Sequence, residues 1–178
     1  GGYAREVMPL LKTYVAMITQ ITNNEIYFID DFAETGSVIN DCIVYKFDDF
    51  ESKFADRNVF CCVAIADRKL RENLTNKCLE SDIKMISVKA VNSLVMDEVN
   101  LGEGSVLSPF VTITSNVTIG KSFHANIYSY VAHDCVIGDF VTFAPAVKCN
   151  GNVHVKSGAY IGTGAIIHPG TKDKPMII

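Results

Sequence analysis

An uninterrupted six-residue repeat runs from Val95 to about Lys172 and constrains the second half of this 178-residue chain. The fifth residue of each repeat is nearly always small or β-branched, and the first residue of every repeat is apolar. These first positions are Val95, Leu101, Leu107, Ile113, Ile119, Ala125, Val131, Ile137, Phe143, Cys149, Val155, Ile161 and Ile167. A period of six with two inward positions is the signature of a parallel β-helix built from hexapeptide repeats. One coil takes three repeats, so we expect residues eighteen apart to stack.

The first half of the chain alternates helical and strand patterns. Apolar residues with helical spacing predict a helix over residues 4–19, and a second helix over 67–80 is expected to turn Leu70, Leu74 and Leu79 inward. Four strands are expected, at residues 25–29, 41–45, 59–66 and 84–88. The third reads VFCCVAIA, as expected for a strand that is buried on both faces.

This alternation predicts a small parallel α/β sheet, here a Rossmann-like domain whose first strand would precede Gly1. We expect two domains, a nucleotide-sugar-binding domain at 1–88 and the β-helix at 89–178. The chain begins with two glycines and no Met, and it stops in an apolar stretch like the start of another coil. We therefore expect residues to be missing at both ends, including C-terminal coils.

Composition excludes several classes of function. A net charge of −4 and a pI near 5.5 give no basic surface for nucleic acid. The chain contains no run of eighteen apolar residues, so no membrane span is predicted. The six cysteines show neither a disulfide-scaffold spacing nor clustered zinc ligands. We therefore expect reduced cysteines, no metal and a cytoplasmic location.

The repeat also indicates where chemistry could occur. His133 takes the third position of its hexad, at an outward corner, and the equivalent residue one coil later is Gly151. An imidazole can take a proton from a nucleophile, and the adjacent Asp134 can orient the ring. Gly151 offers a backbone N–H without a side chain, which suits a one-donor oxyanion hole. The alternative is that His133 is only a tolerated polar corner, as we expect of the remaining three histidines, His124, His154 and His168.

The stretch VAHDCVIGDFVTFAPAVKCNGNVHVKSGAYIGTGA resembles the bacterial sugar O-acyltransferase family, which contains sialic acid O-acetyltransferases and nucleotide-sugar N-acetyltransferases. The opening GGYAREV resembles the glycine-rich loop of that family. The segment IYFIDD resembles its second strand with a paired acid, and VAIADRKLRENL resembles its segment with a following arginine-containing helix. The resemblance covers nearly the whole chain in the same order.

This resemblance implies a homotrimer of left-handed β-helices, with acetyl-CoA between neighbouring helices and a nucleotide sugar on the N-terminal domain. It implies that His133 is the general base, that Asp134 tunes it, and that Gly151 donates its N–H to the thioester carbonyl. Coenzyme contacts are implied at Thr142, Gly151 and Thr163. Nucleotide-sugar contacts are implied at Gly2, Tyr3, Asp30, Asp31 and Ala66.

Several departures from the family pattern bear on the sugar that is bound. Tyr3 stands where a His is common, Ala66 where a Gly is common, and Thr142 where some members carry His.

Other residues named above have structural alternatives. Asp30 and Asp31 could cap a turn instead of binding the nucleotide sugar. Arg68, Lys69 and Arg71 could face a pyrophosphate or form a solvated helix face.

Three functions follow as hypotheses. The first is N-acetylation of a nucleotide-linked 4-amino-4,6-dideoxy sugar by acetyl-CoA, for surface glycan biosynthesis. The second is O-acetylation of sialic acid or of another polysaccharide sugar. The third is a non-catalytic β-helix that binds a sugar nucleotide or assembles a complex.

Overall fold

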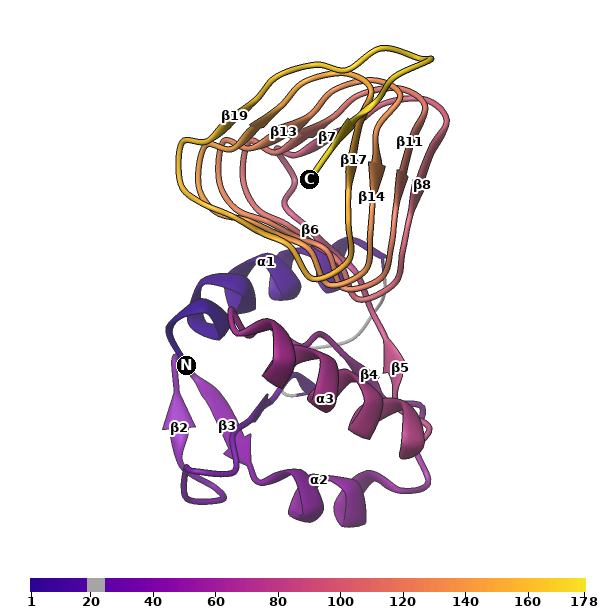
Figure 1. Ribbon diagram of the computed structural model, residues 1–178. Helices are drawn as coiled ribbons and strands as arrows, with labels where there is room; N and C mark the ends of the chain where they lie inside the picture. Colours follow the sequence, from indigo (N-terminus) through magenta and orange to yellow (C-terminus); the bar gives the residue numbers. More distant parts are fainter. Residues whose placement is uncertain (19–24) are drawn as a thin grey trace.

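The computed structural model describes residues 1–18 and 25–178. Figure 1 shows stacked triangular coils in the upper part of the molecule and a smaller group of helices and strands below them. Among the described residues, no helix is long and apolar enough to cross a membrane.

The stacked coils form three parallel sheets of five strands each. The first sheet contains β6 (Val88–Lys89), β9 (Val106–Leu107), β12 (His124–Ala125), β15 (Thr142–Phe143) and β18 (Tyr160–Ile161). The second sheet contains β7 (Leu94–Val95), β10 (Thr112–Ile113), β13 (Tyr130–Val131), β16 (Lys148–Cys149) and β19 (Ile166–Ile167). The third sheet contains β8 (Val99–Leu101), β11 (Val117–Ile119), β14 (Val136–Ile137), β17 (Val153–Val155) and β20 (Met176–Ile177). This arrangement fits a left-handed parallel β-helix and confirms the architecture predicted from the repeat.

The pairing register confirms the expected stacking of residues eighteen apart. Thr112 pairs with Tyr130, and Tyr130 pairs with Lys148 one coil further on. The last pairing differs, because Val153 pairs with Met176. That coil is five residues longer than the others, and residues 168–175 form a loop outside the ladder.

The first and fifth positions of the repeats fill the interior, as predicted. First positions from Leu107 to Ile167 are at most 9% exposed, and they pack with the fifth positions into one apolar core. The fifth position of the last repeat, Thr171, is exposed because it belongs to the loop. Burial of this column of apolar side chains is the main favourable term for the β-helix.

The fourth position of the first twelve repeats has a left-handed backbone conformation. The residues with positive φ in the β-helix are Glu98, Gly104, Phe110, Asn116, Ser122, Tyr128, Asp134, Phe140, Ala146, Asn152, Gly158 and Gly164. This conformation turns the chain at each corner of the prism. Only three of the twelve are glycines, so the stacked coils hold nine other residues in a conformation that costs each of them on the order of 1 kcal/mol.

The smaller part consists of α1 (Gly2–Ile18), β1 (Phe28–Ile29), β2 (Val38–Ile39), β3 (Cys42–Tyr45), α2 (Phe47–Phe54), β4 (Phe60–Cys61), α3 (Arg68–Glu80) and β5 (Lys84–Met85). Strands β1 and β3 are parallel, β2 joins β3 in antiparallel orientation, and β4 and β5 form a separate parallel pair. The predicted parallel pairing is therefore present, whereas the antiparallel β2 was not anticipated. The predicted strand at 59–66 is reduced to Phe60–Cys61, and the end of the predicted first helix, residue 19, lies outside the described residues.

Of the three leucines predicted to turn inward in helix α3, Leu74 is partly buried and packs against a core of Phe47, Val63, Cys78 and Ile83. Leu70 and Leu79 are each 47% exposed, so the prediction that they turn inward was wrong. The buried residues of this helix are Arg71, Thr75 and Cys78. Asp67 caps the N-terminus by accepting a hydrogen bond from the Leu70 N–H at 2.8 Å.

Helices α1 and α3 cover the first sheet of the β-helix. Val7 of α1 packs with Val88 and Val106, and all three are buried. Arg71 of α3 reaches Thr142 of the same sheet. The second and third sheets carry no such cover from the described residues, as Figure 1 shows.

Gly102, Gly120 and Gly138 form a column in which successive coils pack closely. A Cβ on any of them would lie closer than 3 Å to atoms of the next coil. A Cβ on Gly138 would lie 2.8 Å from Ser157 Cα, and other atoms of Ser157 would be closer still. We expect Gly138→Ala to lower the free energy of unfolding by about 1–3 kcal/mol, the usual cost of overpacking. Thermal unfolding of the variant measures this loss.

Gly162→Ala is the matched control for that substitution. A Cβ on Gly162 would meet nothing within 4 Å, so its melting temperature should stay close to that of the wild type. Equal melting temperatures for both variants would contradict the tight stacking described above.

Candidate active site

His133 lies at the corner between the second and third sheets, after β13 and before β14. Its side chain is 61% exposed, and its Nδ1 is 2.7 Å from Asp134 Oδ2. A carboxylate can only accept, so Nδ1 carries the hydrogen in neutral His133. Nε2 then keeps its lone pair and can act as a base on the solvent side of the corner.

Gly151 lies against the His133 ring, one coil further along the β-helix. A Cβ on Gly151 would lie 2.6 Å from Cε1 and 2.7 Å from Nε2 of His133. Any other residue at this position would therefore displace the imidazole. The stacking predicted from the repeat brings these two residues into contact.

The N–H of Gly151 makes no hydrogen bond within the described parts of the chain, whereas its carbonyl accepts one from Gly170 at 3.0 Å. The same hexad position at a neighbouring corner shows what such an N–H can reach. The N–H of Lys121 donates to Asp139 Oδ1 at 2.9 Å, and that of Asp139 donates to Ser157 Oγ at 3.0 Å. The N–H at this position thus reaches side-chain oxygens, and an oxyanion is an acceptor of the same kind.

The two predicted threonine contacts for the coenzyme lie in different environments. Thr163 is exposed, at the corner between the first and second sheets, so a single chain does not bring it to His133. Thr142 is only 3% exposed, and its Oγ1 accepts a hydrogen bond from Arg71 at 2.8 Å. The expectation that Thr142 contacts the coenzyme must be corrected, because helix α3 covers its hydroxyl.

The predicted nucleotide-sugar residues are only partly brought together. A cavity of about 220 Å³ at the start of α1 is lined by Gly1, Ala4, Arg5, Phe28, Ile29, Asp30 and Ile39. Gly2 begins α1 beside this cavity, where free N–H groups of a helix N-terminus favour an anion. Asp30 accepts a hydrogen bond from the Phe32 N–H at 3.1 Å, so it also holds the turn.

Asp31 and Ala66 lie outside this cavity. Asp31 Oδ1 accepts a hydrogen bond at 2.7 Å from the N–H of Phe47, the first residue of α2. Asp31 therefore holds the N-terminus of α2, and the turn-capping alternative has direct support at Asp30. Ala66 is exposed in the loop that precedes α3.

Tyr3 points into the interior instead of the cavity at the start of α1. Its ring packs on that of His124 with 5.2 Å between centroids, and its hydroxyl is buried. Burial raises the pKa of Tyr3 above its ordinary value. Tyr3 therefore supports the junction between α1 and the first sheet.

His124 and Arg71 were placed incorrectly by sequence reasoning. His124 was expected at the surface and is fully buried, and the same is true of Arg71, which was expected at a pyrophosphate or on a solvated helix face. Desolvation, followed by the nearby Arg71 charge, holds the pKa of His124 well below its ordinary value. A signal was available: Val88 and Val106 occupy the same outward-facing column, and apolar residues there indicate a covered face.

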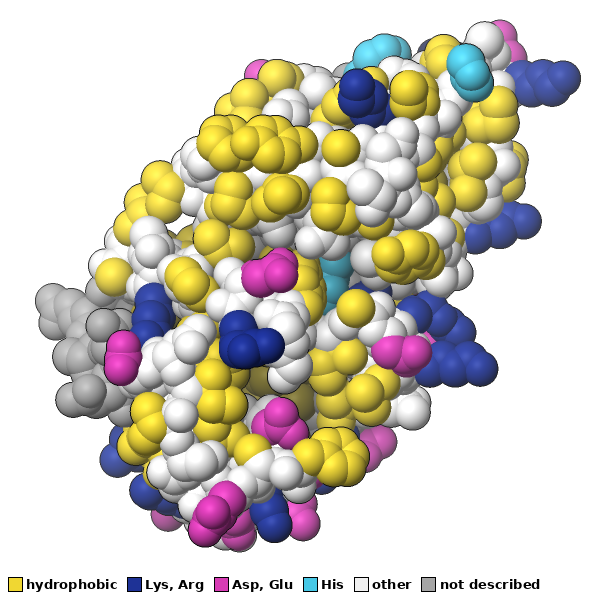
Figure 2. Space-filling view, turned by 90° about the vertical axis from the view of Figure 1, so that its left-hand side faces the viewer, with side chains coloured by type: hydrophobic (Ala, Val, Ile, Leu, Met, Phe, Trp, Pro, Cys, Tyr) yellow, Lys and Arg dark blue, Asp and Glu magenta, His cyan; other side chains and the backbone are white. Residues whose placement is uncertain are grey.

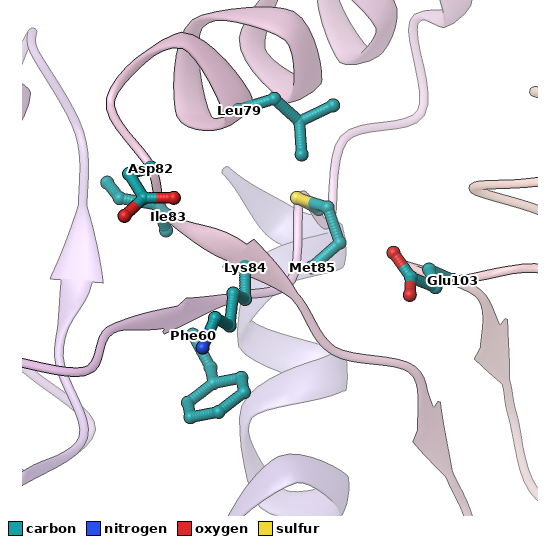
Figure 3. Close-up of a pocket in the computed structure, with 7 residues that line it drawn as sticks. All are labelled: Phe60, Leu79, Asp82, Ile83, Lys84, Met85 and Glu103. Carbon is teal, nitrogen blue, oxygen red and sulfur yellow. The ribbon is translucent and has the colours of Figure 1, made fainter.

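A second cavity, of about 240 Å³, lies where β4 and β5 meet the end of α3. Figure 3 shows Leu79 of α3 and Met85 of β5 facing each other there, with Glu103 of the β-helix to one side. None of its lining residues belongs to the predicted site. In the described parts of the chain, no group of three or more His, Cys, Asp or Glu could hold a metal ion.

Comparison with known proteins identifies the family. No family model matches the chain. A GDP-perosamine N-acetyltransferase from Escherichia coli O157:H7 is 42% identical over 178 residues, which cover all of this chain and 79% of that relative.

Two solved structures are similar over 99% of this chain. WeeI from Acinetobacter baumannii AYE is 48% identical, with a TM-score of 0.93 over 81% of its length. PerB from Caulobacter crescentus, solved with CoA and GDP-perosamine, is 17% identical with a TM-score of 0.73 over 87% of its length, a likeness that shows the fold alone. The sequence matches confirm the predicted resemblance: the chain belongs to the hexapeptide-repeat nucleotide-sugar acetyltransferases.

Proposed function

We propose that this chain transfers the acetyl group of acetyl-CoA to the amino group of a nucleotide-linked 4-amino-4,6-dideoxy sugar, for surface glycan biosynthesis. The contact of His133 with Asp134 and Gly151 at one exposed corner carries this proposal. The name of the E. coli relative, which specifies GDP-perosamine and N-acetylation, favours a GDP-linked amino sugar over the hydroxyl acceptor and over a non-catalytic module.

The proposed mechanism needs no covalent enzyme intermediate. The sugar amine attacks the thioester carbonyl carbon while His133 Nε2 takes the proton that the nitrogen loses. The carbonyl oxygen becomes an oxyanion that accepts the Gly151 N–H, and Asp134 stabilises the imidazolium. The C–S bond then breaks, the amide forms, and the CoA thiolate takes up the proton from His133.

The nucleotide sugar is proposed to contact Gly2, Asp30 and Ala66. Asp30 follows β1 and Ala66 follows the extended segment after β4, and in parallel α/β sheets ligands bind beyond the carboxyl ends of the strands. The two parallel pairs support a Rossmann-like assignment for this part. We retain 1–88 and 89–178 as the proposed domains, although Val88 already pairs with Val106 in the β-helix.

A homotrimer is proposed because one chain does not complete this site. His133 lies at the corner opposite the first sheet, whereas α1 and α3 lie on that sheet (Figure 1). Hydrophobic side chains are spread over the side of the β-helix seen in Figure 2, and the β-helix exposes large ones at Phe110, Ile127, Tyr128, Val136, Tyr160 and Ile166. Exposed apolar surface of this kind marks subunit contacts.

In such an assembly, His133 of one subunit would act on a sugar held by its neighbour, and the exposed Thr163 would contact the coenzyme between them. We also propose a cytoplasmic location, which the six unpaired cysteines support.

Removal of the base is the first test. We expect His133→Ala to lower kcat by at least about a hundredfold, the usual contribution of a general base. Release of CoA thiol from acetyl-CoA with GDP-perosamine as acceptor measures this loss. His154→Ala is the matched control, because His154 lies on β17, which pairs with β14, and this variant should keep most of the activity. A His133→Ala enzyme as active as this control would refute the mechanism.

Gly151→Ala separates catalysis from stability. The three atoms nearest to the new methyl group all belong to the exposed ring of His133, which can rotate away. We therefore expect a loss of at least about tenfold in kcat, since the base leaves its position, with a melting temperature near that of the wild type. An unchanged kcat would show that the stacked ring position is not needed.

Mixed oligomers test the shared site. We expect the native mass of a trimer, and we expect His133→Ala and Ala66→Trp chains to be weakly active alone, because the tryptophan fills the proposed sugar site. Trimers assembled from equal amounts of both should regain about a quarter of wild-type activity, because each site needs one intact half from each neighbour. No recovery, or a monomeric mass, would place the whole site in one chain.

A further inference from the structure

Arg71 connects helix α3 to two other parts of the molecule. Its Nη1 donates to the Ile65 carbonyl at 2.8 Å and lies 3.5 Å from the Ala66 carbonyl. Its Nη2 donates at 2.8 Å to the Phe140 carbonyl and to Thr142 Oγ1. One guanidinium therefore joins the loop before α3 to the coil of residues 131–148.

The charge of Arg71 has no acidic partner within ion-pair distance among the described residues. An ionisable group in direct contact with it is His124, whose Nδ1 is 3.2 Å from Nη1. Because a guanidinium has only donors, His124 must accept this hydrogen bond in its neutral form. Burial of Arg71, the largest cause, lowers the pKa of its guanidinium.

This environment is costly for a residue whose only task is to pack a helix. A buried charge without a counter-ion is destabilising, and an apolar side chain would hold α3 on the first sheet without that cost. An apolar residue cannot hydrogen-bond the carbonyls of the loop before α3, nor the Phe140 carbonyl and the Thr142 hydroxyl of the β-helix. The planar fork of arginine does this, whereas a lysine ammonium is a single point of charge.

The two sets of groups that Arg71 contacts belong to the two parts of the proposed site, one that binds the sugar and one that carries the base. Ile65 and Ala66 belong to the loop that is proposed to hold the nucleotide sugar. Phe140 and Thr142 belong to the coil that also carries His133 and sets its place in the prism. Coenzyme binding, by contrast, is proposed on the exposed corners of the β-helix, where Arg71 has no contact.

We propose that Arg71 is a positioning residue for the nucleotide sugar: it holds the loop of Ile65 and Ala66 in a fixed place relative to the β-helix. This inference rests on the proposed function. It assigns Arg71 to the placement of the acceptor sugar and not to acetyl-CoA.

Arg71→Lys tests the inference, because it keeps the charge and removes the fork. We expect KM for GDP-perosamine to rise at least about tenfold, since small displacements of a bound substrate are costly. KM for acetyl-CoA should change less than about twofold. A general loosening of the fold would raise both constants, so equal rises would overturn the proposal, as would two unchanged constants.

Lys77→Gln is the matched control, because it removes a half-exposed cation from the same helix that contacts Asp48 and not the loop of Ile65 and Ala66, and it should leave both constants unchanged. Thr142→Val gives a milder form of the test: it removes one acceptor of Arg71 with little change of shape. It should raise KM for GDP-perosamine by a few fold, and this variant decides the question if Arg71→Lys does not assemble.

Amide hydrogen exchange gives a readout that does not depend on turnover. In Arg71→Lys, we expect residues 63–67 to exchange at least about tenfold faster, while the coil of residues 131–148 keeps its protection. Unchanged exchange in that loop would overturn the proposal. If the wild-type enzyme acetylates no nucleotide-linked amino sugar, both the proposed function and this inference fail. If the wild-type enzyme is active and Arg71→Lys has unchanged constants, only this inference fails.

Discussion

Backbone hydrogen bonds between successive coils hold the corner of His133 and Gly151 together. Each coil donates to and accepts from its neighbours, about 4.8 Å away, in a register set by eighteen residues. The left-handed residue at every fourth hexad position makes the corners recur in vertical columns. His133 and Gly151 are in contact because this ladder places them one coil apart. The stacking of the coils therefore sets the relative position of these two residues.

The sequence was sufficient to predict this half of the molecule. A strict period leaves few choices, since any shift in register would turn the apolar first position outward. The corner position of His133 and its contact with Gly151 followed from the same count. The role of each residue in transfer stays a proposal, because geometry at one corner does not measure a rate.

The junction between the two parts was not predicted, and the reason is physical. The leucines of residues 67–80 favour burial of one face, but the chain buries Arg71 and Thr75 and leaves Leu70 and Leu79 about half exposed. Arg71 could take the interior only because carbonyls, Thr142 and His124 were available as acceptors. His124 and Thr142 belong to strands 53 and 71 residues away in sequence, which no local pattern reveals.

The loop at residues 168–175 has a consequence for how such enzymes can diversify. It leaves the ladder at the corner column of His133 and Gly151, and Gly170 is tied to the Gly151 carbonyl. The chain rejoins the ladder at Met176, which pairs with Val153. Changes in the length or polarity of this loop can therefore alter access to His133 while the coils beneath keep their places. Access to this corner and the stability of the β-helix can then evolve separately.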